Sequence, residues 1–169
     1  AARDCLDEFT AGDIYRYDEA RDYPVEAATS RLSPHLKFGT IGVREVYAAT
    51  EAAMADAEGD EAESVAEFQS QLAWREFYTH VLADNPEVVT ENFKEYDNAI
   101  EWRDDEEELR AWKEGRTGYP IVDAGMRQLR DEAHMHNRVR MIVASFLTKD
   151  LLVDWREGYA HFRDRLADH

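Results

Sequence analysis

The chain has 169 residues, of which 44% are hydrophobic and 11% aromatic, so it can bury the core of one globular domain and is not a disordered chain. It carries 37 acidic against 20 basic residues, a net charge of −17, which argues against a surface that is uniformly attractive to nucleic acid. It has no apolar run long enough to span a bilayer, no signal-peptide pattern and a single cysteine, Cys5, which together indicate a protein of the reducing cytoplasm.

The first half of the chain is predicted to be helical. Ser33-Pro34 is typical of a helix cap followed by a first-turn proline, and the glycines at 39 and 42 separate this short helix from one beginning near Val43. After a loop at Gly59-Asp60, a long helix is expected over residues 64–83. One face of that helix carries Gln71, Trp74, Arg75 and Tyr78, and an apolar face carries Ala73, Phe77 and Val81.

The second half predicts four elements. Residues 85–101 lack periodicity and are expected to form a connecting loop, after which Asp104 and Glu107 have capping-box spacing for a helix ending at Gly115. Pro120 can begin the next helix, whose apolar positions are Val122, Met126, Leu129 and Ala133. A following helix presents Asn137, Met141, Ala144 and Ser145 on one face, and the last amphipathic stripe consists of Trp155, Tyr159, Phe162 and Leu166. Strand-like alternation is essentially absent, so the expected class is all-α.

The acidic residues are concentrated in two segments, 58–67 and 104–108. Two interpretations of the charge follow. Either nucleic acid is not the partner, or the acid lies on the solvent face, as in proteins from high-salt cells, where salt screens the repulsion. We favour the halophilic interpretation, in which both acidic segments face away from a rim formed by Arg21 and Arg138.

Three stretches carry most of the functional information. Residues 29–36 read TSRLSPHL, residues 71–78 read QLAWREFY, and residues 115–155 read GRTGYPIVDAGMRQLRDEAHMHNRVRMIVASFLTKDLLVDW. Together, in this order, they resemble the flavin-binding helical domain of DNA photolyases and cryptochromes. The resemblance covers residues 1–169 and implies a partial multi-helical FAD-binding domain, with the N-terminal α/β antenna domain and the end of the flavin domain outside this chain.

The resemblance implies FAD as cofactor and assigns several side chains to it. The residues expected to hold FAD are Tyr17, Thr29, Ser30, Arg31, Leu32, Ser33, Phe68, Arg75 and Arg140. Read alone, Thr29–Ser33 offers hydroxyls and backbone N–H groups that suit an anion, with ordinary capping as the alternative. Arg140 could otherwise form a surface salt bridge. We expect Thr29–Ser33, Arg75 and Arg140 to face one cavity.

A second set of residues is assigned by the resemblance to DNA that contains a lesion. These are Arg21, Gln71, Trp74, Asn137, Arg138 and Met141. A tryptophan on a helix is usually core, but Trp74 with Gln71 one turn earlier and Arg75 beside it suits an extruded base pair. For Arg21 the alternative is a surface arginine among acids.

Trp102 and Trp155 are the redox candidates. By resemblance they correspond to the outer and middle members of an electron-transfer series, whereas Trp112 is expected to pack structurally. No metal site is expected, because His134 and His136 would face different ways on a helix and Cys5 is alone.

The expected function is light-driven repair of cyclobutane pyrimidine dimers by a monomeric enzyme, of which this fragment alone would be inactive. Gln71 departs from the glutamate usual in dimer photolyases and favours a (6-4) photolyase or an animal cryptochrome. Asn137 and Met141 match the dimer-repair pattern and outweigh it. The alternatives are a cryptochrome-like photosensor, (6-4) photoproduct repair, or a structural helical domain without cofactor.

Overall fold

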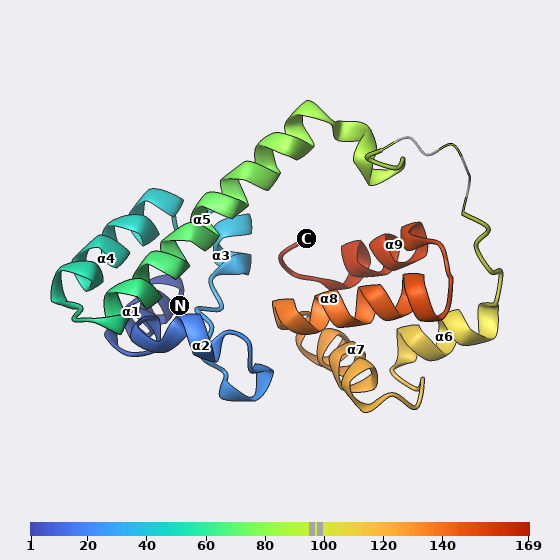
Figure 1. The fold of residues 1–169 in the computed structure, drawn as a ribbon, viewed down its shortest axis with the longest axis horizontal. Helices are drawn as coiled ribbons and strands as arrows, with labels where there is room; N and C mark the ends of the chain where they lie inside the picture. Colours follow the sequence, from blue (N-terminus) through green and yellow to red (C-terminus); the bar gives the residue numbers. More distant parts are fainter. Residues whose placement is uncertain (95–96, 98–99) are drawn as a thin grey trace. The chain divides into compact units, whose positions relative to one another are not determined.

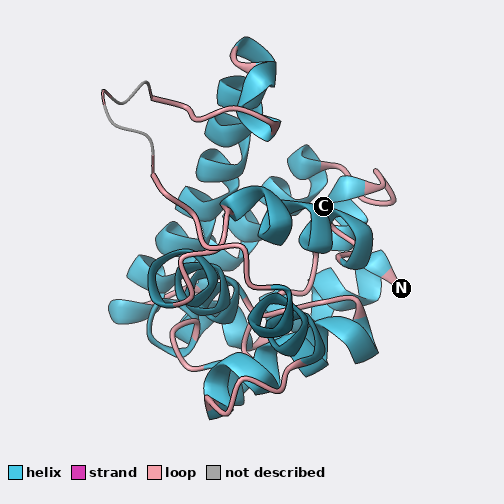
Figure 2. Ribbon diagram, turned by 90° about the vertical axis from the view of Figure 1, so that its right-hand side faces the viewer, coloured by secondary structure: helices cyan, strands magenta, loops and turns pink. Residues whose placement is uncertain are grey.

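The computed structural model describes residues 1–94, 97 and 100–169, and over these ranges it contains helices and loops but no strand (Figures 1 and 2). The predicted all-α class is confirmed. The chain divides into two compact units, residues 1–84 with Asp168 and residues 85–167 with His169, each with its own hydrophobic core. Within the described ranges, no helix combines the length and the apolar character needed to cross a bilayer.

The first unit contains five α-helices and two short 3₁₀ turns. In chain order they are α1 (Ala2–Ala11), η1 (Asp13–Arg16), α2 (Tyr17–Ala20), η2 (Pro24–Glu26), α3 (Ser33–Lys37), α4 (Val43–Asp56) and α5 (Asp60–Asp84). The core forms where η1, α2 and α4 pack against the first half of α5, and α1 packs on η1 and α4. Buried Ser64 ties this core together, because its hydroxyl donates to the Ile14 carbonyl at 2.7 Å and accepts from the Asp18 N–H at 3.2 Å.

The helix α5 differs from the prediction at its start and along its face. It begins at Asp60, earlier than predicted, because Gly59 adopts a left-handed conformation and Asp60, Glu61 and Glu63 stabilise the positive end of the helix dipole. Its buried residues, Ser64, Val65, Phe68 and Leu72, all lie in the first half. The second half of α5 extends past the other helices of this unit (Figure 1), so the predicted apolar face there is exposed at Phe77.

The start of α3 also differs from the prediction. Ser33 is the first helical residue and Leu32 is the N-cap, so Ser33 does not cap the helix and no side chain accepts from the first turn. The proline therefore stands one position later than predicted.

In its described part, the second unit contains four α-helices. Its elements are η3 (Pro86–Val89), α6 (Glu106–Glu114), α7 (Pro120–Glu132), α8 (Asn137–Ser145), the π-helical turn η4 (Phe146–Asp150) and α9 (Trp155–Arg165). Trp112 is fully buried at the centre of the core and donates from its indole N–H to the Val143 carbonyl at 3.0 Å, which confirms its predicted structural role. Gly125 lets α7 approach α8 closely, because a Cβ there would lie 2.4 Å from Val139 Cγ1.

The Thr-Gly-Tyr-Pro stretch has a local structural role. Asp123 is buried in the first turn of α7 and accepts from the Thr117 N–H and hydroxyl, both at 2.7 Å, and from the Gly118 N–H at 3.0 Å. Burial raises the pKa of this carboxyl, but the bonds from Thr117 and Gly118 and the nearby Arg127 outweigh it, so the pKa lies below its usual value. The ionised carboxylate thus holds the loop before α7 in shape.

Three details of the second unit correct the prediction. The cap of α6 is Asp105 rather than Asp104, since its carboxylate accepts from the Glu108 N–H at 3.0 Å, while Gly115 ends the helix as predicted with φ 66°. His134 and His136 lie in the turn after α7 rather than on a helix, and His136 caps α8 by accepting from the Arg138 N–H. The loop predicted over residues 85–101 contains the short η3 turn and no longer helix among its described residues.

Candidate functional site

Tyr17 and Phe68, both predicted on the cofactor side, lie together in the first unit. With Phe9 they form an aromatic cluster in which the Tyr17 ring centroid is 5.2 Å from that of Phe68 and 5.8 Å from that of Phe9. Burial raises the pKa of the Tyr17 hydroxyl, although the neighbouring Arg21 opposes the rise. Tyr17 therefore stays neutral and can donate a hydrogen bond at physiological pH.

A polar network borders this cluster. The Arg21 guanidinium lies 5.6 Å from the Tyr17 ring centroid and forms an ion pair with Glu67, one turn before Gln71 on α5. The Gln71 amide Nε2 donates to the same Glu67 carboxylate at 2.8 Å. Arg21 and Gln71 are thus brought together by an acidic residue that was expected to face away from them. The expectation is wrong for Glu67, because its helical position places it directly over Arg21.

The loop that carries Thr29 to Ser33 is fixed to the core through one side chain. Leu32 is only 1% exposed and packs with the first-unit core, so it anchors the loop by its side chain. Arg31 is exposed and adopts a left-handed conformation with φ 51°, which is unfavourable for a residue with a Cβ. Ser30 Oγ accepts from the Leu32 N–H at 3.4 Å. The half-buried Thr29 and Ser30 and the uncapped first turn of α3 form a polar surface here.

Farther along α5, three aromatic side chains form an exposed surface. Trp74 is 50% exposed and stacks on Tyr78 with the centroids 5.9 Å apart, as expected for two residues on one helix face. Phe77 was assigned to an apolar face, but it lies 5.5 Å from Trp74 and joins the same surface. Arg75 forms an ion pair with the adjacent Glu76 at 2.8 Å.

The second unit contains a hollow of about 740 Å³ at α8 and η4. Arg138 and Met141 line it, together with Ser145 of the predicted face; the other lining residues are Tyr119, Ile121, Val122, Ile142, Phe146, Lys149 and Asp150. Met141 is 56% exposed, and Asn137 Nδ2 lies 4.0 Å from its sulfur. Of the six residues predicted to contact DNA, Arg138 and Met141 therefore line the hollow, and Asn137 lies beside Met141.

The side chain of Arg140 does not share the contacts of its neighbours on α8. Its Nε donates to the Met135 carbonyl at 2.7 Å, and it does not line the hollow. Thr29–Ser33 and Arg75 belong to the first unit and Arg140 to the second, so their common cavity stays a prediction.

The two redox candidates lie on neighbouring segments of the second unit. Trp155 begins α9, donates to Asn92 Oδ1 at 3.1 Å and has the Arg156 guanidinium 4.8 Å from its ring centroid. Trp102 is half-buried, and the adjacent Arg103 N–H donates to the Leu152 carbonyl at 2.7 Å. That bond holds the Trp102 segment beside the segment that leads into Trp155.

The sequence did not predict the role of Glu67, or the residues outside α8 that line the hollow. The spacing of four between Glu67 and Gln71 is a usable signal for a contact on a helix. Lys149 could not be found in this way, because a π-helical turn changes the periodicity that places residues 146–150. Tyr119 could not be found either, because it packs on Phe146 of the same turn.

Comparison with known proteins gives a consistent result. Residues 68–169 match the family of the FAD binding domain of DNA photolyase. The chain is 70% identical, over its whole length, to the deoxyribodipyrimidine photo-lyase of Halobacterium salinarum, and 48% identical over 99% of its length to that of Agrobacterium fabrum. It covers 36% and 34% of those two proteins, so it spans about a third of the length of these relatives.

Solved structures agree with this. A class III photolyase from Agrobacterium tumefaciens matches with a TM-score of 0.93 at 48% identity, over 99% of this chain and 34% of that one. A cryptochrome from Synechocystis matches with a TM-score of 0.90 at 31% identity, over 100% of this chain and 35% of that one. The chain belongs to the family of FAD-binding domains of DNA photolyases. Its acidic composition accords with its 70% sequence identity to a protein from Halobacterium.

Proposed function

We propose that this chain is the part of a deoxyribodipyrimidine photo-lyase that holds the phosphate side of FAD and part of the lesion site. The observation that carries the proposal is that Arg138 and Met141 line one hollow and Asn137 lies beside Met141, within a chain that matches photo-lyases along its whole length. Excited reduced FAD, when bound, supplies the electron that opens a cyclobutane pyrimidine dimer, and the protein supplies binding and orientation.

The residues on the cofactor side fit a dinucleotide. The loop at Thr29–Ser33 offers hydroxyls and the uncapped N–H groups of the first turn of α3, which suit pyrophosphate oxygens. Neutral Tyr17 beside Phe68 offers an apolar wall with a hydroxyl donor. Arg75 and Arg140 add positive charge.

The residues on the DNA side fit an extruded base pair. Trp74 with Tyr78 gives a stacking surface on α5, and Met141 gives a soft apolar contact in the hollow. Arg138 lies at the wall of the hollow, where a guanidinium can reach a phosphate.

The contact between Gln71 and Glu67 supports dimer repair, although glutamine stands at position 71 where dimer photolyases usually have glutamate. The amide nitrogen of Gln71 is engaged by Glu67, which leaves its carbonyl oxygen as the acceptor for a base N–H. In this orientation Gln71 presents the same kind of acceptor as a carboxylate.

Trp102 and Trp155 are proposed to carry an electron between FAD and solvent, since their segments are neighbours and both indoles are half-buried. We also propose that the protein is a monomer of the cytoplasm; unpaired Cys5 accords with a reducing compartment.

A cryptochrome-like photosensor is the second candidate, because the Synechocystis cryptochrome matches over the whole chain. Binding measured in the dark distinguishes the two candidates. The protein tested has the full length of the photo-lyase relatives and contains these 169 residues. It is offered oligonucleotides with one cyclobutane dimer, one (6-4) photoproduct or no lesion. We expect preference for the dimer.

With Arg138→Ala, affinity for all three should fall alike and the salt dependence should weaken by about one phosphate contact. Equal binding of the three oligonucleotides by the unmodified protein would contradict dimer recognition.

A further inference from the structure

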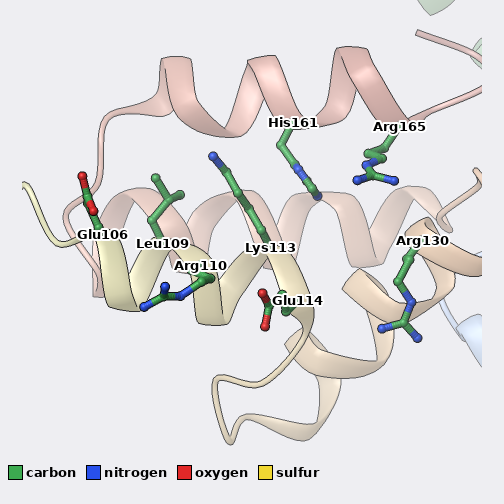
Figure 3. A pocket seen from close by; sticks show the side chains of 8 residues that line it. All are labelled: Glu106, Leu109, Arg110, Lys113, Glu114, Arg130, His161 and Arg165. Atoms are coloured by element: carbon green, nitrogen blue, oxygen red, sulfur yellow. The ribbon is translucent and has the colours of Figure 1, made fainter.

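The second unit has another hollow, of about 540 Å³, that the proposed function does not use. Its lining residues come from α6 (Glu106, Leu109, Arg110, Lys113, Glu114), α7 (Arg130) and α9 (His161, Arg165). It shares no lining residue with the hollow at Met141. Figure 3 shows Lys113 reaching from α6 toward α9, with His161 and Arg165 reaching from α9 toward α6.

The charge of this hollow is opposite to that of the chain. Four permanent cations and one histidine line it, whereas the whole chain carries a net charge of −17. Among the described residues, neither Arg110 nor Arg165 takes part in an ion pair, while Lys113 is 3.2 Å from Glu157 and Arg130 is 2.8 Å from Asp131. Of the two lining glutamates, Glu114 is already paired with Arg116 outside the set. Positive charge at the hollow is therefore incompletely neutralised.

We propose that this hollow binds a small oligophosphate anion. Arg110, Lys113 and Arg165 would bind its phosphate oxygens, since guanidinium and ammonium groups form strong charge-assisted bonds to phosphate. The volume is in the range of small-molecule sites, and cations on three helices can contact more than one phosphate group at once. None of the residues assigned to the lesion or to FAD lines this hollow, so the inference does not depend on the proposed function.

His161 provides an internal reporter for binding. Burial lowers the pKa of its imidazole, and Lys113 and Arg165 lower it further, while Asp164 opposes them; Arg110 and Arg130 also line the hollow. An anion among these cations should raise that pKa. Binding should accordingly tighten as the pH falls below the usual imidazole value of about 6.5.

The test is calorimetric titration of the 169-residue chain with pyrophosphate, inorganic sulfate and a short duplex DNA at one ionic strength, with His161 followed by NMR. We expect saturable binding of one pyrophosphate, weaker sulfate binding, and a shift of the His161 signals. Arg165→Gln should weaken pyrophosphate about tenfold, and Arg165→Lys should recover part of the loss.

Arg163→Gln is the matched control, because it removes the same charge from α9. The native Arg163 pairs with Asp164 and does not line the hollow. Equal weakening by Arg163→Gln and Arg165→Gln would overturn the proposal and leave only non-specific attraction. Duplex DNA that shifts His161 more than pyrophosphate does, or the absence of any saturable binding, would also overturn it. Unfolding temperatures of each variant show whether a loss of binding reflects a loss of fold.

Discussion

At the scale of single residues, the hydrogen bond between Gln71 and Glu67 determines which groups the proposed lesion site could bind. Gln71→Glu would place a second carboxylate at the 2.8 Å contact with Glu67, where Arg21 already pairs with Glu67 and can offset the added charge. A carboxylate accepts hydrogen bonds as the Gln71 carbonyl does, and a charge-assisted bond is about twice as strong as a neutral one. In a protein of the full length of the relatives that contains this chain, we expect Gln71→Glu to retain or raise dimer repair.

Repair rates of Gln71→Glu and Gln71→Leu check this, with Gln71→Leu expected to lose lesion discrimination. Loss of repair by Gln71→Glu would mean that Gln71 is read as an amide donor as well as an acceptor. That result would favour a different photoproduct.

Glu67 also holds the charge of Arg21, and this predicts an unusual gain. Glu67→Gln removes the ion pair and frees the guanidinium for a DNA phosphate, so affinity for undamaged DNA should rise and the salt slope should steepen by about one counterion. Glu63→Gln removes the same charge from the exposed face of α5 and serves as control. An equal gain in both variants would show that only net charge matters.

At the scale of the elements, Asp123 links the loop before α7 to that helix. Asp123→Asn keeps the shape but turns one accepting oxygen into a donor, which opposes the Gly118 or Thr117 N–H. We expect a loss of about 1–3 kcal/mol in the free energy of unfolding at neutral pH. Because the pKa of Asp123 is lowered in the folded state, its contribution is present above the unfolded value of about 3.9 and disappears as the pH falls through the folded value.

Chemical denaturation of wild type and Asp123→Asn between pH 7 and pH 3 measures this. The difference between the two should shrink toward the acid end. A difference that stays constant with pH would mean that packing, and not the ionised carboxylate, is responsible.

The elements also show what can be read from the sequence. Apolar spacing identified α7 and α8, and Gly115 identified the end of α6, because these signals are local. The caps at Leu32 and Asp105 were each missed by one residue, because two adjacent aspartates compete for the cap of α6, while α3 begins without a side-chain cap. Glu67 lies outside the predicted motifs, and Tyr119 lies within residues 115–155 but contacts Phe146 of a π-helical turn that apolar spacing does not predict. Composition gave no sign of two separate cores.

At the scale of the whole molecule, the division of contacts predicts weak cofactor binding by this chain alone. It carries the residues assigned to the phosphate side of FAD, and it spans about a third of the relatives. Each missing charge-assisted bond is worth about 1.5–3 kcal/mol, and each 1.4 kcal/mol is about tenfold in affinity. We therefore expect the 169-residue chain to bind FAD weakly or not at all in a fluorescence titration. Stoichiometric flavin on the purified chain would contradict this division.

A repair assay under blue light tests the proposed light-driven repair of dimers. A family-length protein containing these residues is loaded with reduced FAD and given an oligonucleotide with one cyclobutane dimer, in light and in darkness. We expect dimers to disappear only in the light, and Met141→Ala to slow their loss. A protein that binds FAD and the dimer but leaves the dimer intact in the light would contradict light-driven repair.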